Sequence, residues 1–349
     1  MSARAPVLKV RDLAVHFRVD RGRFFRHDYQ TLRAVDNVSF DLFPAETLGI
    51  VGESGCGKST LARAILGLVR PQAGSVVWLG EDLMGLSEEA MRLKRREIQL
   101  IFQDPSGSLD PRMTVGEIVA EPLRVFYPSM TRLQVRERVS GMMKLVGLSP
   151  DQINRYPHEF SGGQCQRIGI ARALVVNPRL VVCDEPVSAL DVSIQAQIVN
   201  LLKDLQKKLQ LSLIFIAHDL SVVRHVSDRV LVMYLGRIME VADRDRIYLD
   251  PRHPYTRALI ESVPIPDPVL ERARVRRALE GDMPSPLDPP TGCVFRTRCP
   301  FAAPACADRV PVLETLDDGR QVACLRHEEI RAQAEDAVSL TMAPDPAKR

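Results

Sequence analysis

Short apolar runs of strand length alternate with stretches of helical spacing over Leu8–Ala242. Leu180–Cys183 and Leu213–Ala217 are continuous apolar runs, which is typical of strands covered on both faces of a parallel sheet. Leu48–Val51 and Ile98–Phe102 are shorter runs of the same character. This alternation of strands and helices predicts an α/β fold in which the apolar runs share one sheet.

Two helices are predicted from spacing and from the residues that follow them. Lys58–Leu68 reads as a helix that ends near Gly67, and a proline follows shortly afterwards. Arg132–Val146 carries apolar residues along one face, including the pair Met142–Met143. That pair fits helical core, which we favour, and it also fits an exposed groove.

The pattern changes after Asp250, where frequent prolines interrupt every long periodic stretch. We therefore expect a main domain over residues 1–250, a loop-rich extension over 251–331 and a frayed tail over 332–349. This division leaves one large α/β unit and one smaller appendage, which a chain of 349 residues accommodates.

Composition narrows the function classes. Hydrophobic residues make up 45% and charged residues 26% of the chain, which is ordinary for a globular protein. The formal net charge of +3 gives no electrostatic reason to expect nucleic acid as a partner. No apolar run approaches the roughly 20 residues that span a bilayer, and the first residues lack the apolar core of a secretory signal. We expect a cytoplasmic chain that reaches a membrane only through a partner.

One segment matches the P-loop template and lies between a predicted strand and a predicted helix, the context that the motif requires. It reads Gly52-Glu53-Ser54-Gly55-Cys56-Gly57-Lys58-Ser59, followed by Thr60. Its glycines let backbone N–H groups face phosphate oxygens, and the helix N-terminus adds a positive dipole end. Lys58 is suited to the β- and γ-phosphates of ATP, and the Ser59 hydroxyl to Mg²⁺. Cys56 is either a target for thiol reagents or an inert small residue, and we favour the second.

Polar residues follow three of the predicted strands. Asp184 and Glu185 end one apolar run, Gln103 follows another and His218 follows a third. Because strand carboxyl ends converge at the ligand edge of an α/β sheet, we expect these side chains to meet beside the P-loop. Asp184 would hold Mg²⁺, and Glu185 would orient or deprotonate the attacking water. Gln103 would contact either Mg²⁺ or the attacking water. His218 would contact the γ-phosphate.

Ser161-Gly162-Gly163-Gln164 resembles the signature motif of ABC ATPases, and Ser188-Ala189-Leu190-Asp191 resembles their D-loop. With the P-loop, Gln103, Asp184-Glu185 and His218, the family's motif order is complete over about Leu8–Ala242. The resemblance implies a RecA-like core with antiparallel β and helical subdomains, the helical one at about 104–176. It also implies a head-to-tail dimer, in which Ser161, Gly162, Gly163 and Gln164 close over ATP held by a second cassette.

Two segments of the extension narrow the resemblance. His253-Pro254-Tyr255-Thr256-Arg257-Ala258-Leu259 and Cys293-Val294-Phe295-Arg296-Thr297-Arg298-Cys299-Pro300 look like the C-terminal region of oligopeptide and dipeptide permease ATPases. The resemblance implies ATP-driven oligopeptide import at the cytoplasmic face of the plasma membrane. The implied partners are a second, different ATPase subunit, two transmembrane permease subunits and, through them, an extracytoplasmic solute-binding protein. An importer for dipeptides, nickel or another solute is the main alternative, ahead of a non-transport ABC ATPase.

The adenine ring is expected to stack on an aromatic residue upstream of the P-loop. Phe17 is the first candidate and Tyr29 the second, and the insertion over Arg21–Tyr29 makes the register ambiguous. The remaining interpretation is that each is an ordinary core or loop aromatic.

Four of the seven cysteines cluster in the extension, at Cys293, Cys299, Cys306 and Cys324. Four thiolates suit Zn²⁺ or a [4Fe–4S] cluster, and reduced thiols without a metal are the third possibility. The gaps between them do not resemble the short CxxC spacing of zinc sites. The resemblance to peptide permease ATPases favours [4Fe–4S], with Arg296 and Arg298 offsetting its negative charge.

Overall fold

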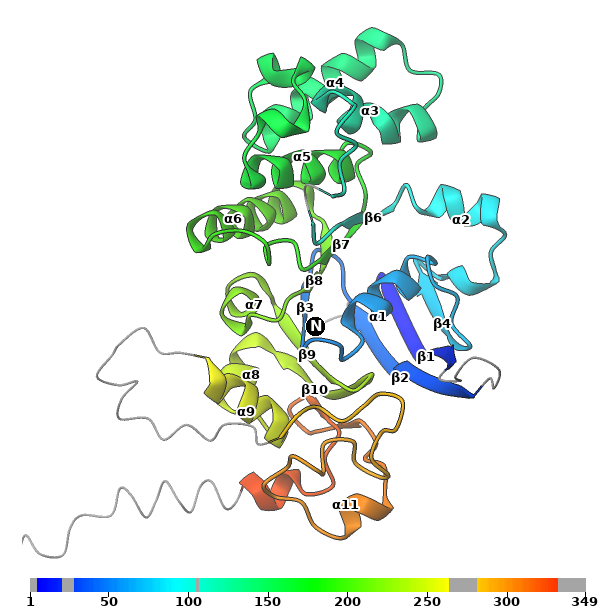
Figure 1. Ribbon diagram of the computed structural model, residues 1–349, viewed down its shortest axis with the longest axis vertical. Coiled ribbons are helices and arrows are strands. Elements are labelled where there is room, and N and C mark those ends of the chain that lie inside the picture. Colours follow the sequence, from blue (N-terminus) through cyan, green and yellow to red (C-terminus); the bar gives the residue numbers. More distant parts are fainter. Residues whose placement is uncertain (1–4, 21–27, 105–106, 264–280, 332–349) are drawn as a thin grey trace, which may run out of the picture.

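The computed structural model describes residues 5–20, 28–104, 107–263 and 281–331. Within these ranges the chain forms two sheets, with helices gathered at one end and the C-terminal extension at the other (Figure 1). Three parts of the predicted organisation lie outside the described residues, namely most of the insertion that precedes Tyr29, residues 264–280 of the extension and the tail over 332–349.

The larger sheet has the strand order β11-β12-β10-β9-β3-β8-β7-β6. Its strands are β3 (Thr47–Val51), β6 (Ile98–Ile101), β7 (Leu180–Asp184), β8 (Ser212–Ile216), β9 (Arg229–Tyr234), β10 (Arg237–Asp243), β11 (Glu314–Thr315) and β12 (Gln321–Val322). The pairs β6–β7, β7–β8, β8–β3 and β3–β9 are parallel, and the remaining pairs are antiparallel. The prediction that the four apolar runs share one parallel sheet is confirmed, with ends that differ by one residue.

The smaller sheet is antiparallel, in the order β2-β1-β4-β5. Its strands are β1 (Leu8–Asp20), β2 (Tyr29–Leu42), β4 (Ala73–Trp78) and β5 (Glu81–Asp82). It packs with α1 against one face of the larger sheet, where Leu180, Val182 and Ile214 point into a shared apolar core.

Helices cover the opposite face, where the alternate residues Val181, Cys183 and Phe215 belong to a second core. This two-residue alternation explains the continuous apolar strands, because each strand is buried on both faces. On both faces together, the helices of the described residues are α1 (Lys58–Ile65), α2 (Glu88–Lys94), α3 (Val115–Phe126), α4 (Arg132–Leu145), α5 (Gly162–Leu174), α6 (Val192–Leu209), α7 (Leu220–Val226), α8 (Arg244–Leu249), α9 (Pro254–Ser262) and α11 (Ala305–Asp308), and short 3₁₀ turns lie at Leu83–Gly85, Pro150–Asn154 and Pro157–Glu159.

The predicted helix over Lys58–Leu68 is three residues too long. It ends at Ile65 because Gly67 takes a left-handed φ of +62° and the N–H of Leu68 bonds back to the Arg63 carbonyl at 2.8 Å. The pair Met142–Met143 on α4 is buried, so its interpretation as helical core is confirmed.

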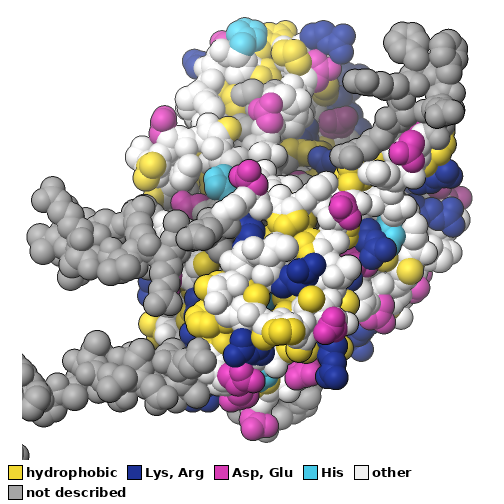
Figure 2. Space-filling model, turned by 60° about the horizontal axis from the view of Figure 1, so that its bottom comes forward, with side chains coloured by type: hydrophobic (Ala, Val, Ile, Leu, Met, Phe, Trp, Pro, Cys, Tyr) yellow, Lys and Arg dark blue, Asp and Glu magenta, His cyan; other side chains and the backbone are white. Residues whose placement is uncertain are grey.

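The C-terminal extension adds two short strands to the larger sheet. Strand β12 pairs antiparallel with β10, and β11 pairs with β12. These strands were not predictable from the sequence, because each is two residues long and two residues carry no measurable periodicity. Figure 2 shows basic, acidic and apolar side chains interspersed over the end of the molecule where the extension lies. Within the described ranges, no helix has the length and apolarity that crossing a bilayer requires.

Candidate active site

The P-loop connects β3 to α1 and wraps around the Lys58 ammonium. Lys58 is almost fully buried, and its Nζ donates hydrogen bonds to the carbonyls of Gly52 at 2.8 Å and Glu53 at 2.9 Å. The side chain that would face a triphosphate is therefore anchored to the loop that would cradle it.

Two loop glycines stand where a side chain has no room. Gly57 has a φ of +106°, and a Cβ there would lie 2.0 Å from the carbonyl oxygen of Ala34. A Cβ at Gly52 would lie 2.2 Å from the carbonyl oxygen of Met233. The loop packs directly against the backbone of its neighbours, so these positions require glycine for steric as well as conformational reasons.

Ser59 on α1 and Asp184 at the end of β7 are joined by a hydrogen bond of 2.8 Å from the Ser59 Oγ to the Asp184 carboxylate. Burial raises the pKa of Asp184, and the bond from Ser59 only partly offsets that effect. A hydroxyl and a carboxylate at one point are oxygen ligands of the type that Mg²⁺ prefers, so these residues fit the ion.

Glu185 is the meeting point of three strand ends. Its Oε2 accepts a hydrogen bond from Gln103 Nε2 at 3.1 Å and lies 3.4 Å from His218 Nδ1. Glu185 itself follows β7, while Gln103 follows β6 and His218 follows β8. The predicted convergence of these three side chains is therefore observed, and their chemical roles stay predictions.

The backbone of Glu185 is unusual, with a left-handed φ of +47°. Its N–H bonds to the Ile216 carbonyl at 3.0 Å, which ties the position to β8. Non-glycine residues held in this region often mark functional sites, because surrounding structure must enforce the conformation.

The Ser161–Gln164 motif opens α5 with a capping box. The Ser161 Oγ accepts from the Gln164 N–H at 3.4 Å, and the Gln164 Oε1 accepts from the Ser161 N–H at 3.0 Å. Ser161 and Gly162 are exposed, and α5 lies among the helices, apart from α1 (Figure 1). The motif is thus presented outward from its own P-loop, as the dimer hypothesis requires.

The two adenine-stacking candidates differ in their surroundings. Phe17 on β1 is 40% exposed and Tyr29 on β2 is 53% exposed. The Arg18 guanidinium lies 4.6 Å from the centroid of the Tyr29 ring. That cation–π contact occupies one face of the Tyr29 ring, and Phe17 stays the first candidate for the stacking residue.

Cys56 lies inside the P-loop but is buried, with its Sγ 3.8 Å from Lys58 Nζ. Burial raises the pKa of the Cys56 thiol in spite of the nearby ammonium. A buried neutral thiol is a poor nucleophile, which favours the interpretation of Cys56 as an inert small residue.

The four cysteines of the extension surround one small cavity of about 20 Å³. Burial raises the pKa of Cys299 to about 11 and that of Cys324 to about 12. Among the described residues, no group of three His, Cys, Asp or Glu side chains is arranged to hold a metal ion. The predicted iron–sulfur cluster therefore has no support from the geometry of this region.

The predicted role of Arg298 beside these thiols is wrong. Its guanidinium points to the P-loop, where it forms an ion pair with the Glu53 carboxylate at 2.9 Å. Arg296 instead bonds to the Thr291 carbonyl. Sequence reasoning also missed Tyr255, whose Oη accepts a hydrogen bond from the Glu53 N–H at 3.0 Å. Tyr255 lies in a segment that carries no local sequence signal of a contact with the P-loop.

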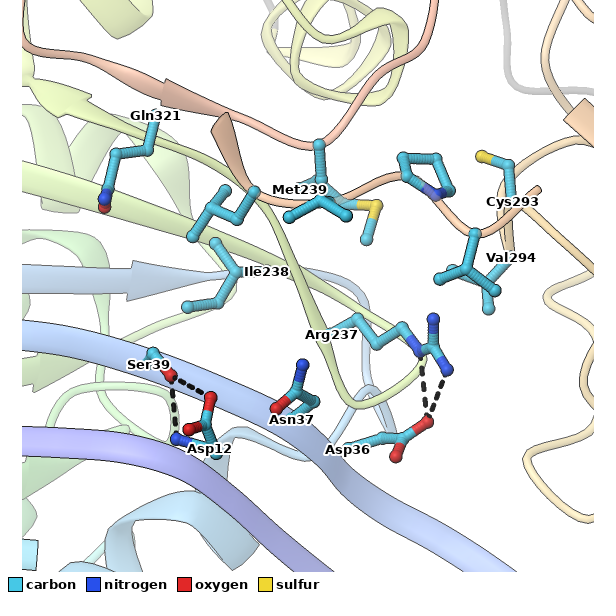
Figure 3. A pocket seen from close by; sticks show the side chains of 15 residues that line it. Asp12, Asp36, Asn37, Ser39, Arg237, Ile238, Met239, Cys293, Val294 and Gln321 are labelled. Carbon is cyan, nitrogen blue, oxygen red and sulfur yellow. Dashed lines mark hydrogen bonds and ion pairs between the residues drawn. The ribbon is translucent and has the colours of Figure 1, made fainter. Parts of the chain in front are cut away.

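A larger pocket of about 350 Å³ lies where the extension meets β2 and β10. Figure 3 shows two polar contacts among its lining residues: Arg237 binds Asp36, and Ser39 binds Asp12. The lining also includes the polar residues Asn37 and Gln321 and apolar residues such as Met239 and Val294. The pocket therefore lies at a junction between core and extension, where Arg237 and Asp36 form an ion pair.

A strand–loop–helix phosphate cradle, with a hydroxyl and carboxylate beside it and a second carboxylate at the next position, defines a P-loop nucleoside triphosphatase. Residues 35–188 match the family described as ABC transporter, and residues 239–306 match the family described as oligopeptide/dipeptide transporter, C-terminal region.

The chain is 62% identical over 312 residues to the oligopeptide transport ATP-binding protein OppF of Escherichia coli strain K12, covering 89% of this chain and 93% of that protein. It is 58% identical over 322 residues to OppF of Haemophilus influenzae, covering 92% and 97%. The dimeric post-hydrolysis structure of the ATP-binding cassette MJ0796, bound to ADP and Pi, matches with a TM-score of 0.61 at 28% identity, covering 68% of this chain and 98% of that one. The chain belongs to the ATP-binding subunits of ABC transporters, in the group that carries the oligopeptide/dipeptide transporter C-terminal region.

Proposed function

We propose that this chain is the ATP-hydrolysing subunit that powers import of oligopeptides across the cytoplasmic membrane, as one half of a nucleotide-binding dimer. The observation that carries the proposal is the meeting of Gln103, Glu185 and His218 beside the Ser59–Asp184 hydrogen bond. The similarity to OppF along most of the chain supports a peptide as the transported solute.

In the proposed mechanism, the P-loop amides and Lys58 bind the phosphates, and the N-terminus of α1 adds its positive end. Glu185 orients the attacking water and accepts its proton as the oxygen bonds to the γ-phosphorus and the bond to the β,γ-bridging oxygen breaks. Gln103 and His218 fix the Glu185 carboxylate, and His218 is exposed enough to reach a γ-phosphate. Ser59, Asp184 and Gln103 would hold Mg²⁺, which would neutralise the developing phosphate charge.

The second half of the site is proposed to come from another cassette. Ser161, Gly162 and Gly163 lie at the N-terminus of α5, where Ser161 and Gly162 are exposed, and this arrangement suits a phosphate held by a partner's P-loop. A related but different ATPase subunit is the proposed partner. The assembly would lie at the cytoplasmic face of the membrane, bound to two permease subunits. A solute-binding protein outside the membrane would contact those permease subunits.

The helical part offers a place for the permease contact. A groove of about 500 Å³ runs between α3 and α4, lined by residues that include Ala120, Arg124 and Val135. We also propose the division predicted above: an ATPase domain over residues 1–250 with a helical subdomain at about 104–176, and an extension over 251–331. The match of residues 239–306 to the transporter C-terminal family supports a separate extension.

The four thiols of the extension remain our proposed ligands for a [4Fe–4S] cluster, because their donor chemistry fits it. Four thiols are the number of ligands that such a cluster takes. Such a cluster would cross-link a segment that has few buried apolar residues of its own. Iron, sulfide and zinc analysis after anaerobic purification tests this, and an apo preparation with normal stability and activity would remove the proposal.

The function is tested by reconstituting the full transporter in liposomes with ATP and Mg²⁺. We expect ATP hydrolysis that rises when an oligopeptide and the solute-binding protein are supplied, together with peptide uptake. Uptake of oligopeptides, dipeptides and nickel by a deletion strain identifies the solute. Loss of nickel or dipeptide uptake alone would replace oligopeptides by that solute, and an assembly that neither binds ATP nor releases phosphate would end the proposal.

A further inference from the structure

The side chain of Glu53, the second residue of the P-loop, is bound by a residue of the C-terminal extension. Arg298 Nη1 lies 2.9 Å and 3.0 Å from the two carboxylate oxygens of Glu53. The Arg298 side chain is 7% exposed and that of Glu53 is 27% exposed. This is a shielded, charge-assisted pair, which is much stronger than an ion pair in open water.

The extension also holds the Glu53 backbone. The Glu53 N–H donates to Tyr255 Oη at 3.0 Å, and the Glu53 carbonyl accepts from Lys58 Nζ at 2.9 Å. All three polar groups of Glu53 are therefore engaged. The carbonyl bonds to Lys58, the lysine proposed to face the phosphates, whereas the N–H and the carboxylate bond to residues of the extension.

The residues that grip Glu53 are themselves rigidly supported. Tyr255 is fully buried, with its ring centroid 4.7 Å from that of Tyr234 on β9 and 5.3 Å from that of Phe295. Tyr234 Oη lies 3.5 Å from Arg298 Nη1. The extension thus reaches the P-loop through a packed aromatic cluster, not through a loose loop, so it can fix the position of Glu53.

We propose that Arg298 and Tyr255 are positioning residues of the ATPase site, through which the C-terminal extension holds the P-loop in its ATP-binding form. Arg298 does this by neutralising and orienting the Glu53 carboxylate, which would otherwise lie as an unpaired negative charge in the loop that receives a triphosphate. Tyr255 fixes the Glu53 peptide group. The inference rests on the proposed function in that it requires the chain to bind ATP.

The test compares variants of the purified transporter complex by their KM for ATP, their kcat and their thermal stability. Arg298→Gln is expected to raise KM about tenfold or more while kcat changes about twofold at most, because the loss of a shielded charged hydrogen bond acts on binding. Tyr255→Phe keeps the ring and is expected to raise KM by about threefold to tenfold. The control is Arg309→Gln, an exposed arginine of the same extension, with unchanged kinetics.

A double variant separates positioning from simple support of the fold. Adding Glu53→Gln to Arg298→Gln removes the unpaired charge, so most of the lost ATP affinity should return even though the ion pair is absent. A purely structural role predicts a lower melting temperature with a normal KM, and no rescue.

Unchanged KM in both Arg298→Gln and Tyr255→Phe would overturn the inference. If Arg298→Gln does not fold, Tyr255→Phe decides alone. Failure of the proposed function looks different, because the unmodified complex would then show no ATP binding or hydrolysis at all.

Discussion

Glu185 shows how much of this site depends on single residues. It combines a left-handed backbone, at a cost of about 1–3 kcal/mol, with a carboxylate held between Gln103 and His218. If Glu185 were only a residue of a solvated turn, its backbone would relax to a negative φ. The surrounding strands enforce this one, and the consequence is that the carboxylate stands beside the P-loop.

Replacing Glu185 by Gln keeps the size of the side chain and removes its basicity. We expect ATP to bind and be trapped while the hydrolysis rate falls by a factor of about 10²–10⁴, the usual contribution of a general base. Phosphate release and nucleotide retention by the assembled transporter measure this. The exposed Glu314 on β11 provides a matched control, and near-normal turnover in Glu185→Gln would assign the base elsewhere.

At this scale the sequence predicted one kind of contact and missed another. The meeting of Gln103, Glu185 and His218 was predictable because each lies within two residues of the carboxyl end of a strand of one parallel sheet. The contact between Glu53 and Arg298 joins positions 245 residues apart. Arg298 lies in a loop with no periodicity to place it, and so no local pattern could indicate its partner.

At the scale of elements, hydrogen bonds at helix N-termini position two functionally important segments. The capping box of α5 fixes the outward-facing signature motif, and the serine and glutamine three positions apart make it readable from sequence. Helix α9 is capped differently, by His253, whose Nδ1 accepts the Tyr255 N–H at 3.0 Å. The same His253 donates its backbone N–H to the Glu240 carboxylate on β10 at 2.9 Å, which joins α9 to the sheet.

His253 makes this junction sensitive to acid. Burial lowers the pKa of His253 to about 3, from an ordinary value of 6.5. The unfolded chain therefore binds a proton that the folded one refuses, so the stabilisation is present above about pH 6.5 and is lost as the pH falls toward 3. Between about pH 5.5 and 4, His253 should lower the free energy of unfolding by about 1.4 kcal/mol for each pH unit.

Urea unfolding at several pH values measures this against His253→Asn, which keeps a cap acceptor but does not titrate. The difference between the two proteins is the useful quantity. Burial raises the pKa of the nearby Glu240. In both proteins that shift changes the free energy of unfolding with pH in the direction opposite to the effect of His253, so it cancels in the difference. Parallel stability profiles for the two proteins would show that His253 contributes nothing to the acid response.

At the scale of the whole molecule, the extension and the ATPase core share one apolar interior. Phe295 is fully buried, with its ring centroid 5.4 Å from that of Tyr234 on β9 and 5.3 Å from that of Tyr255 on α9. The prolines of the sequence predict a loop-rich appendage, but they could not reveal that this segment inserts aromatic residues into the main core.

Phe295→Ala should therefore weaken the entire molecule and not the extension alone. We expect a loss of about 3–5 kcal/mol in the free energy of unfolding, in a single transition seen by probes in both parts. Val312→Ala, at a position 71% exposed, is the control with little effect. Separate transitions for core and extension would contradict this shared interior.

The pairing of β12 with β10 has a consequence for how the protein is made. Strand β10 emerges from the ribosome well before β12, so its outer backbone groups stay open until Gln321 and Val322 have also been synthesised. An open strand edge is a template for pairing with another nascent chain. Transcripts or proteolytic events that remove the last segment should accordingly yield products that depend on chaperones or accumulate as insoluble material.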